Sequence, residues 1–154
     1  MEPDDAFEIR RLESGDTRLL RDMLTMMGEV FDEPATYTAA QPDDAYLDGL
    51  LGGRQFIAII ATAGGRVVGG LAAYELQKFE QARSEIYIYD LAVDAAHRRL
   101  GIATGLIDRL RGVARERGAW VISVQADPPD APAVALYTKL GVREEVLHFD
   151  IGVG

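Results

Sequence analysis

The chain contains no cysteine and only two histidines in 154 residues. Without cysteine there can be no disulfide bonds, thiolate metal sites or covalent intermediates on sulfur. His97 and His148 lie far apart in the sequence, so we expect no histidine-rich site and no metal. No apolar run approaches the roughly 20 residues that a membrane-spanning helix needs. The acidic stretch Met1–Asp5 does not resemble a secretory signal, and we expect a cytoplasmic protein.

Positive charge is also scarce, with 16 Lys and Arg against 25 Asp and Glu and a formal net charge of −9. Such a chain is not expected to bind nucleic acid, because phosphate binding requires a broad basic surface. The negative charge suits a cationic small-molecule amine, whose approach an acidic cleft would accelerate. Acidity that serves only solubility would look the same.

The length suits one domain over residues 1–154. Apolar periodicity and turn residues predict strands at 7–12, 56–63, 66–76, 85–93, 119–126 and 142–151. They predict helices at 19–30 and 42–51, one from Gly101 to Gly118, and one from Asp130 to Leu140. This order favours an antiparallel first half followed by βαβ crossovers. We therefore expect an α/β fold whose mixed, largely antiparallel central sheet is flanked by about four helices.

The basic residues that are present gather at His97–Arg99, directly before Gly101 and a predicted helix. The first turn of a helix has about four unpaired N–H groups and a partial positive charge, which attract phosphate. Gly101 lets the backbone approach a ligand, Ala103 is too small to block it, and the arginines add charged donors. This order favours a pyrophosphate site over a solvated basic turn. It matches neither a Walker loop nor a Gly-x-Gly-x-x-Gly turn.

Arg98-x-x-Gly101-x-Ala103, after a strand ending Leu91-Ala92-Val93, resembles the acetyl-CoA pyrophosphate loop of the GCN5-related N-acetyltransferases (GNAT). The resemblance implies a loop that holds the pyrophosphate, made of Arg98, Arg99, Leu100, Gly101, Ile102, Ala103 and Thr104. It also implies that the backbone of Leu91, Ala92 and Val93 pairs with pantetheine and polarises the thioester carbonyl.

A second segment, Asp130–Gly141, resembles another motif of the same family. Tyr137 falls where the family places a tyrosine that protonates the departing CoA thiolate. Asp130 stands where asparagine is frequent, and Val142 where an aromatic residue often follows the glycine. Because aspartate also caps helices, we expect the acetyl-CoA site to survive both departures.

Three segments resemble more specifically the aminoglycoside 3-N-acetyltransferases of the gentamicin-modifying type: Lys78–Val93, Pro132–Gly141 and Arg143–Ile151. Weaker similarity extends upstream to about Val30. The resemblance implies transfer of an acetyl group from acetyl-CoA to the 3-amino group of the 2-deoxystreptamine ring of an aminoglycoside antibiotic. A polyamine, another small amine or a peptide N-terminus would be an alternative acceptor. A non-catalytic acyl-CoA-binding module is the alternative of another class.

Asp90 is the best candidate for the group that takes a proton from the attacking amine, directly or through water. It lies in the strand expected to carry the acetyl group. Strict alternation predicts that it shares a face with Ile86 and Ile88, opposite Tyr87 and Tyr89. A carboxylate in apolar company indicates a cleft. From the residues alone, a strand-end aspartate paired with an arginine fits equally well, and the resemblance favours the catalytic role.

Other carboxylates are candidates for holding the ammonium groups of the acceptor: Glu80, Glu85, Asp127 and Asp150. Each is individually as consistent with a solvated surface charge. The predicted last strand has no strand after it, which would leave a sheet edge for a second copy to cover. We therefore expect a homodimer.

Overall fold

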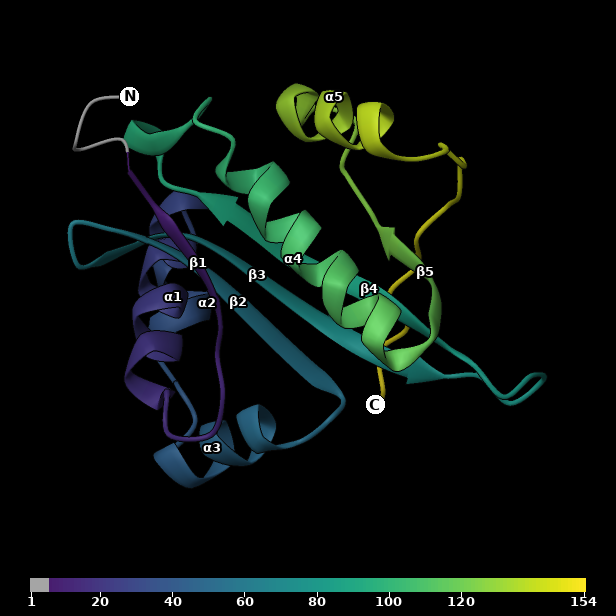
Figure 1. Ribbon diagram of the computed structural model, residues 1–154, viewed down its shortest axis with the longest axis horizontal. Coiled ribbons are helices and arrows are strands. Elements are labelled where there is room, and N and C mark those ends of the chain that lie inside the picture. Colours follow the sequence, from purple (N-terminus) through teal and green to yellow (C-terminus); the bar gives the residue numbers. More distant parts are fainter. Residues whose placement is uncertain (1–5) are drawn as a thin grey trace. The chain divides into compact units, whose positions relative to one another are not determined.

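The computed structural model describes residues 6–154, so the acidic stretch Met1–Asp5 lies outside the described residues. Contacts divide the chain after Ser123 into two compact units. The first contains nearly all of the sheet and the helices up to Arg117, and the second contains the last helix and the segment that follows it (Figure 1). None of the helices in residues 6–154 combines the length and apolarity needed to cross a bilayer.

The sheet has five strands in the order β1-β2-β3-β4-β5. Their bounds are β1 Glu8–Arg11, β2 Phe56–Ala63, β3 Arg66–Gln77, β4 Ser84–Val93 and β5 Ala119–Val124. β1 to β4 pair antiparallel, which confirms the predicted antiparallel first half. Gly64 and Gly65 join β2 to β3 with φ of 58° and 76°. Two successive positive φ angles define the tight turn that matches the twist of a hairpin.

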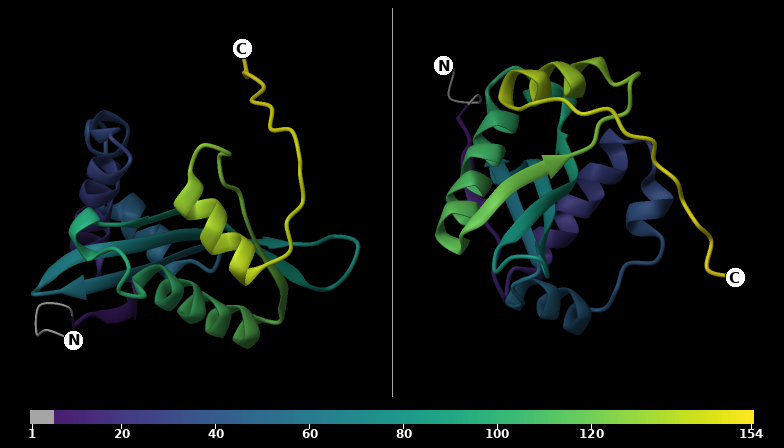
Figure 2. Two further views of the ribbon diagram at one scale, coloured as in Figure 1. Left: turned by 90° about the horizontal axis from the view of Figure 1, so that it is seen from above. Right: turned by 90° about the vertical axis from the view of Figure 1, so that its right-hand side faces the viewer.

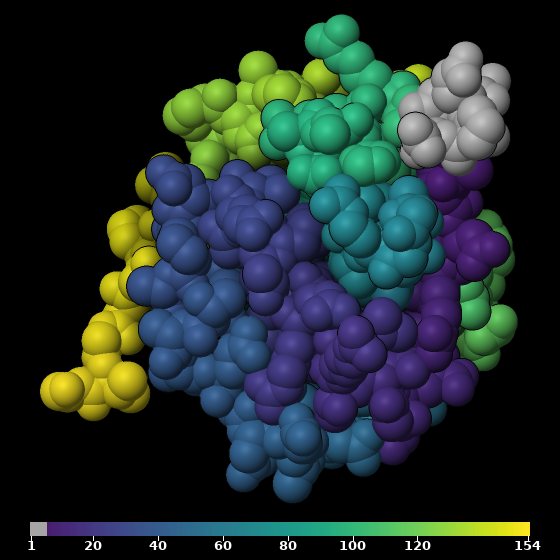
Figure 3. All heavy atoms as spheres, turned by 90° about the vertical axis from the view of Figure 1, so that its left-hand side faces the viewer, coloured from purple at the N-terminus to yellow at the C-terminus, as the bar shows by residue number. Residues whose placement is uncertain are grey.

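Helices cover both faces of this sheet (Figure 2). Their bounds are α1 Thr17–Val30, α2 Pro34–Thr38, α3 Asp44–Gly52 and α4 Ile102–Arg117, with α5 Ala131–Leu140 in the second unit. α1 and α3 bury apolar residues against one face in a cluster that includes Met23, Leu47 and Ile60. Figure 3 shows the surface that α1 (purple) and α2 and α3 (blue) form there. The apolar side of α4, with Leu106 and Leu110 buried, covers the other face.

Two adjacent glycines let both helices approach β3 closely. A Cβ on Gly70 would lie 2.6 Å from Met23 Cγ of α1, and a Cβ on Gly69 would lie 2.7 Å from Ile102 Cγ2 of α4. Both distances are shorter than van der Waals contact allows. The missing side chains therefore set the spacing of the layers at this point.

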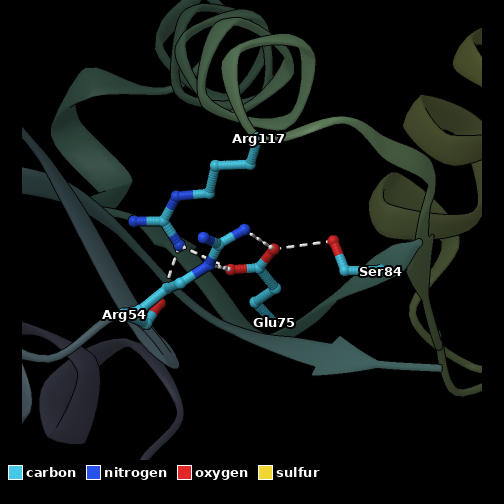
Figure 4. Close-up of polar contacts among 4 residues, drawn as sticks. All are labelled: Arg54, Glu75, Ser84 and Arg117. Carbon is cyan, nitrogen blue, oxygen red and sulfur yellow. Dashed lines mark hydrogen bonds and ion pairs between the residues drawn. The ribbon is translucent and has the colours of Figure 1, made fainter. Parts of the chain in front are cut away.

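A buried carboxylate ties four elements of the first unit together (Figure 4). Glu75 of β3 accepts hydrogen bonds from Arg54 Nε at 2.9 Å, Arg117 Nη1 at 2.9 Å and Ser84 Oγ at 2.6 Å. Burial alone would raise the pKa of Glu75, but the bonds from Arg54, Ser84 and Arg117 outweigh it and hold that pKa at about 2. The charged carboxylate thereby links the segment before β2, the start of β4 and the end of α4.

Two sequence predictions are wrong. Residues 142–151 form no strand, because the second unit offers only α5 and no strand with which their backbone could pair. α1 ends at Val30, where the predicted helix ends, but Pro34 then begins α2, which was not predicted. Proline fits the first turn of a helix because the N–H that it lacks is unpaired there in any helix.

Candidate active site

β4 carries an irregularity at the point where the candidate base lies. Ala72 of β3 pairs with Asp90, and the next residue, Ala73, pairs with Ile88, so Tyr89 is an extra residue in β4. Such a β-bulge shifts the alternation of side chains by one residue. Bulges are common beside active sites because they redirect a side chain out of the regular pleat.

The bulge makes the predicted face of Asp90 wrong. Side chains of paired residues lie on the same face, so Asp90 lies with Ala72, and Tyr87 lies with Tyr74. Ala72 and Tyr74 both belong to the α1 and α3 face. Asp90 therefore shares a face with Tyr87, while Ile88 points to the opposite side. The sequence could not reveal this, because strict alternation assumes an uninterrupted strand.

Asp90 is half-buried and held by a residue that the sequence analysis did not single out. The Tyr37 hydroxyl of α2 donates a hydrogen bond to Asp90 Oδ2 over 3.0 Å. Burial raises the pKa of Asp90, the bond from Tyr37 lowers it in part, and the negative charge of Glu33 raises it again. The pKa of Asp90 therefore lies above its ordinary value. Burial and the neighbouring Asp90 raise the pKa of Tyr37, which keeps its hydroxyl protonated as the donor.

Local chain geometry explains how α2 reaches the sheet. Asp32 adopts a left-handed φ of 54°, which turns the chain sharply after α1. Gly28 of α1 then allows close packing, since a Cβ there would lie 3.2 Å from Pro34 Cα and 3.3 Å from Tyr37 Cβ. The Phe31 and Tyr37 rings pack with centroids 5.7 Å apart. The sequence carried a signal for α2, the proline at its start, but no helix was predicted between residues 30 and 42.

An aromatic cluster lies on the same face as Asp90. The Tyr74 and Tyr89 rings meet edge to face with centroids 5.9 Å apart, and the Tyr87 and Tyr89 rings meet in the same way at 6.2 Å. Burial raises the pKa of Tyr74 and of Tyr87, and the charge of Asp90 adds to both shifts. A carboxylate bordered by tyrosines is suited to binding a cation, because ring faces attract positive charge.

The basic loop after β4 lies in the predicted place. A short 3₁₀ turn, Ala95–His97, follows the strand, and Gly101 precedes α4 with a left-handed φ of 86°. Apart from its two chain neighbours, no residue in the described part of the chain has an atom within 4 Å of the position that a Cβ of Gly101 would occupy. Arg99 also has a positive φ, at 65°, and both arginines are exposed. An open glycine turn beside the first amides of a long helix fits a bound pyrophosphate.

The remaining predicted residues lie in other segments. Tyr137 is on α5, which Asp130 caps by accepting a hydrogen bond from the Ala133 N–H at 3.3 Å. Burial raises the pKa of Tyr137, and the charge of Asp130 adds to the shift. Asp127 is exposed in the loop before α5.

The other three acceptor candidates each have a side chain of Lys or His beside them. Lys78 Nζ lies 3.5 Å from a carboxylate oxygen of Glu80 and 3.7 Å from one of Glu85. Asp150 is exposed and lies 2.9 Å from His148 Nε2. Lys78 thus offsets part of the negative charge before β4, and an ammonium group of an acceptor would have to compete with it.

The sequence profile of the acetyltransferase (GNAT) family matches residues 20–142, which include both Asp90 and the Gly101 loop. The chain belongs to the GNAT family. The match also includes Tyr37 and Tyr137, whereas Asp150 lies outside it.

Two solved structures resemble this GNAT chain over nearly its full length. An aminoglycoside acetyltransferase from an uncultured soil metagenomic sample is 55% identical, with a TM-score of 0.95, and the match covers 97% of this chain and 99% of that one. A second one from an uncultured soil metagenomic sample, in complex with sisomicin, is 30% identical with a TM-score of 0.89. That match covers 99% of this chain and 100% of the other.

Among curated proteins, N-acetyltransferase 8B of Rattus norvegicus is 28% identical over 90 residues, which is 58% of this chain. The GNAT chain spans only 40% of the length of that relative. The comparisons therefore support an acetyltransferase of the GNAT family with aminoglycoside acetyltransferases as structural neighbours.

Proposed function

We propose that this GNAT protein transfers the acetyl group of acetyl-CoA to the 3-amino group of the 2-deoxystreptamine ring of an aminoglycoside, by direct attack. The observation that carries the proposal is the half-buried Asp90, set by a β-bulge on an aromatic face and immediately followed by Leu91–Val93. The 55% identity to an aminoglycoside acetyltransferase supports the choice of acceptor. Antibiotic resistance is the corresponding proposed role.

Asp90 accepts a proton from the acceptor ammonium, directly or through one water, so that the nitrogen lone pair can attack the thioester carbonyl carbon. A raised pKa helps a carboxylate to act as a base near neutral pH. Tyr37 holds the carboxylate in place through its 3.0 Å hydrogen bond. Glu33, whose charge acts on Asp90, adds negative potential that favours a cationic acceptor.

Bound acetyl-CoA would supply the acetyl group on a thioester whose sulfur can leave as a thiolate. The backbone from Leu91 to Val93 would pair with its pantetheine arm, and the residues Arg98–Thr104 would hold its pyrophosphate. As the new C–N bond formed and the C–S bond broke, Tyr137 would donate its hydroxyl proton to the departing sulfur. The second proton of the nitrogen would leave to solvent, from which Tyr137 would be reprotonated. Its raised pKa keeps that proton available at neutral pH.

Acceptor recognition rests on carboxylates and rings. We propose that Glu80, Glu85, Asp127 and Asp150 contribute to binding the several ammonium groups of an aminoglycoside. The Tyr74, Tyr87 and Tyr89 cluster offers ring faces beside Asp90. We propose further that residues 1–154 form one acetyltransferase domain. As expected from the sequence, we propose that the protein is cytoplasmic and forms a homodimer.

The test combines an acceptor panel with product analysis. Purified protein with acetyl-CoA should release free CoA with gentamicin and with sisomicin, and NMR of the product should show acetylation at the 3-amino group. Turnover with spermidine or a peptide N-terminus, but with neither aminoglycoside, would show that the proposed acceptor is wrong. Binding of acetyl-CoA without turnover on any amine would show that the protein is a binding module and not an enzyme. Asp90→Asn is the matched control for non-enzymatic acetylation.

A further inference from the structure

The bulge in β4 sets which carboxylates of the strand lie on the same face as Asp90. In an uninterrupted strand, residues an odd number of positions apart point to opposite faces, and Glu85 precedes Asp90 by five positions. The register with β3 shows what the extra residue changes. Leu76 of β3 pairs with Glu85, and Ala72, four positions before Leu76, pairs with Asp90. The two carboxylates therefore lie together on the α1 and α3 face.

Aromatic rings separate these two carboxylates. A strand advances about 3.3 Å per residue, and four positions of β3 lie between their partners, so Glu85 and Asp90 leave the sheet roughly 13 Å apart. Tyr87 lies between them on the same face and meets Tyr89 edge to face, with ring centroids 6.2 Å apart. A single six-membered ring is too short to place one amine at each carboxylate, whereas amines on two linked rings reach both.

An ammonium group of the chain itself lies beside Glu85. Lys78 Nζ is 3.7 Å from a carboxylate oxygen of Glu85 and 3.5 Å from one of Glu80. The turn that carries Lys78 lies at the end of the β3–β4 hairpin, away from α1 and α2 (Figure 1). The Lys78 N–H donates a hydrogen bond to the Arg83 carbonyl over 2.9 Å, which fixes the start of this turn. A primary ammonium group thus already occupies the position that an amine of the acceptor would take at Glu85.

We propose that Lys78 and Glu85 determine which amines this protein accepts, an inference that rests on the proposed function. The acceptor lies along β4, with its 3-amino group at Asp90, a ring on Tyr87 and an ammonium group of a second ring at Glu85. Lys78 competes for that carboxylate, and an acceptor with a charged second ring displaces it. An amine on a single ring, or a neutral second ring, leaves Lys78 in place and gains nothing from Glu85. The preferred substrates are therefore polycations of at least two linked, amino-substituted rings.

Two substitutions with effects of opposite sign test this role. Glu85→Gln should lower kcat/KM for gentamicin about tenfold, because it removes a charged hydrogen-bond acceptor for the second ring. Lys78→Gln should raise kcat/KM for gentamicin, because it removes the competing ammonium group. A pair that was merely structural would lose activity in both variants. Glu8→Gln on β1 and Arg66→Gln at the start of β3 make the same changes of charge elsewhere in the sheet and should leave kcat/KM nearly unchanged.

2-Deoxystreptamine carries both of its amines on one ring and therefore tests the requirement for a second ring. Its kcat/KM should lie at least about tenfold below that of gentamicin, and Glu85→Gln should change it little. If 2-deoxystreptamine is not acetylated at all, the comparison of Glu85→Gln with Glu8→Gln on gentamicin decides. Equal losses in those two variants, or no gain on gentamicin in Lys78→Gln, would overturn the proposal. A wild type that acetylates no aminoglycoside would overturn the proposed function, and this proposal with it.

Discussion

The Tyr37 hydroxyl donates a hydrogen bond to Asp90 Oδ2 over 3.0 Å and so connects a five-residue helix to the bulged strand of the sheet. The bond favours the ionised form of Asp90, whereas burial and the charge of Glu33 favour the protonated form. We therefore propose that Tyr37 is a positioning residue that also sets the pH at which Asp90, the proposed base, becomes available.

Tyr37→Phe should move the rising limb of the pH profile of kcat/KM to higher pH. Removing the hydrogen bond leaves burial and Glu33 to raise the pKa of Asp90 further, so a larger fraction is protonated at a given pH. We expect kcat/KM on the rising limb itself to fall about tenfold at a given pH. Tyr46→Phe, at an exposed tyrosine of α3, is the matched control.

Asp90→Asn removes the proposed base, whereas Tyr37→Phe removes only the residue that holds it. The asparagine variant should flatten the rising limb of the pH profile and lower turnover about 10²- to 10⁴-fold. An unshifted limb in Tyr37→Phe, with a flattened one in Asp90→Asn, would remove the role of Tyr37 but keep the base.

Tyr137→Phe should lower kcat about 10- to 100-fold while the Kd of acetyl-CoA stays unchanged. The substitution removes only the proton donor and keeps the ring on α5. Single-turnover rates and a calorimetric titration with acetyl-CoA measure the two quantities separately. Thr138→Ala, on the neighbouring exposed position, should change neither. Unchanged turnover in Tyr137→Phe would contradict its role as the acid.

Gly101→Ala should weaken acetyl-CoA binding about tenfold without unfolding the protein. A side chain at a φ of 86° is strained and would occupy the open space beside the loop. The comparison is Gly105→Ala in α4, where a Cβ would make an ordinary 3.5 Å contact with Ile9. Equal affinities for acetyl-CoA in the two variants would argue against pyrophosphate binding at Gly101.

Glu75→Gln should destabilise the fold, and the loss should depend on pH. The folded pKa of about 2 lies below the ordinary value of 4.5, so the charged carboxylate contributes its full stability above pH 4.5. That contribution is lost as the pH falls from 4.5 towards 2, and the shift corresponds to about 3 kcal/mol. Urea unfolding at pH 7 and pH 3 measures it. A stability difference between wild type and Glu75→Gln that does not shrink at pH 3 would contradict this assignment.

The sequence predicted correctly the features that depend on neighbouring residues. The turn at Gly101 and the helix after it follow from a glycine directly before an apolar period of 3.6, and α4 buries Leu106 and Leu110 as that period indicated. Two features depend instead on the tertiary structure. The bulge at Tyr89 arises from pairing with β3, and the contact of Tyr37 with Asp90 joins residues 53 positions apart. The wrong prediction of a strand at 142–151 has a similar cause. Alternation of apolar and polar residues indicates that a segment can form a strand, but it does not show which strand would pair with it.

The Gly69–Gly70 pair lets two helices approach β3 from opposite faces at adjacent residues. On one side Ile102, the first residue after the Gly101 turn, presses on β3, and on the other side Met23 of α1 does so. The helix that begins after the Gly101 turn and the helix that leads to α2 and Tyr37 therefore rest on adjacent residues of one strand. A side chain at either glycine would move one of these two helices away from β3, and with it one side of the proposed site.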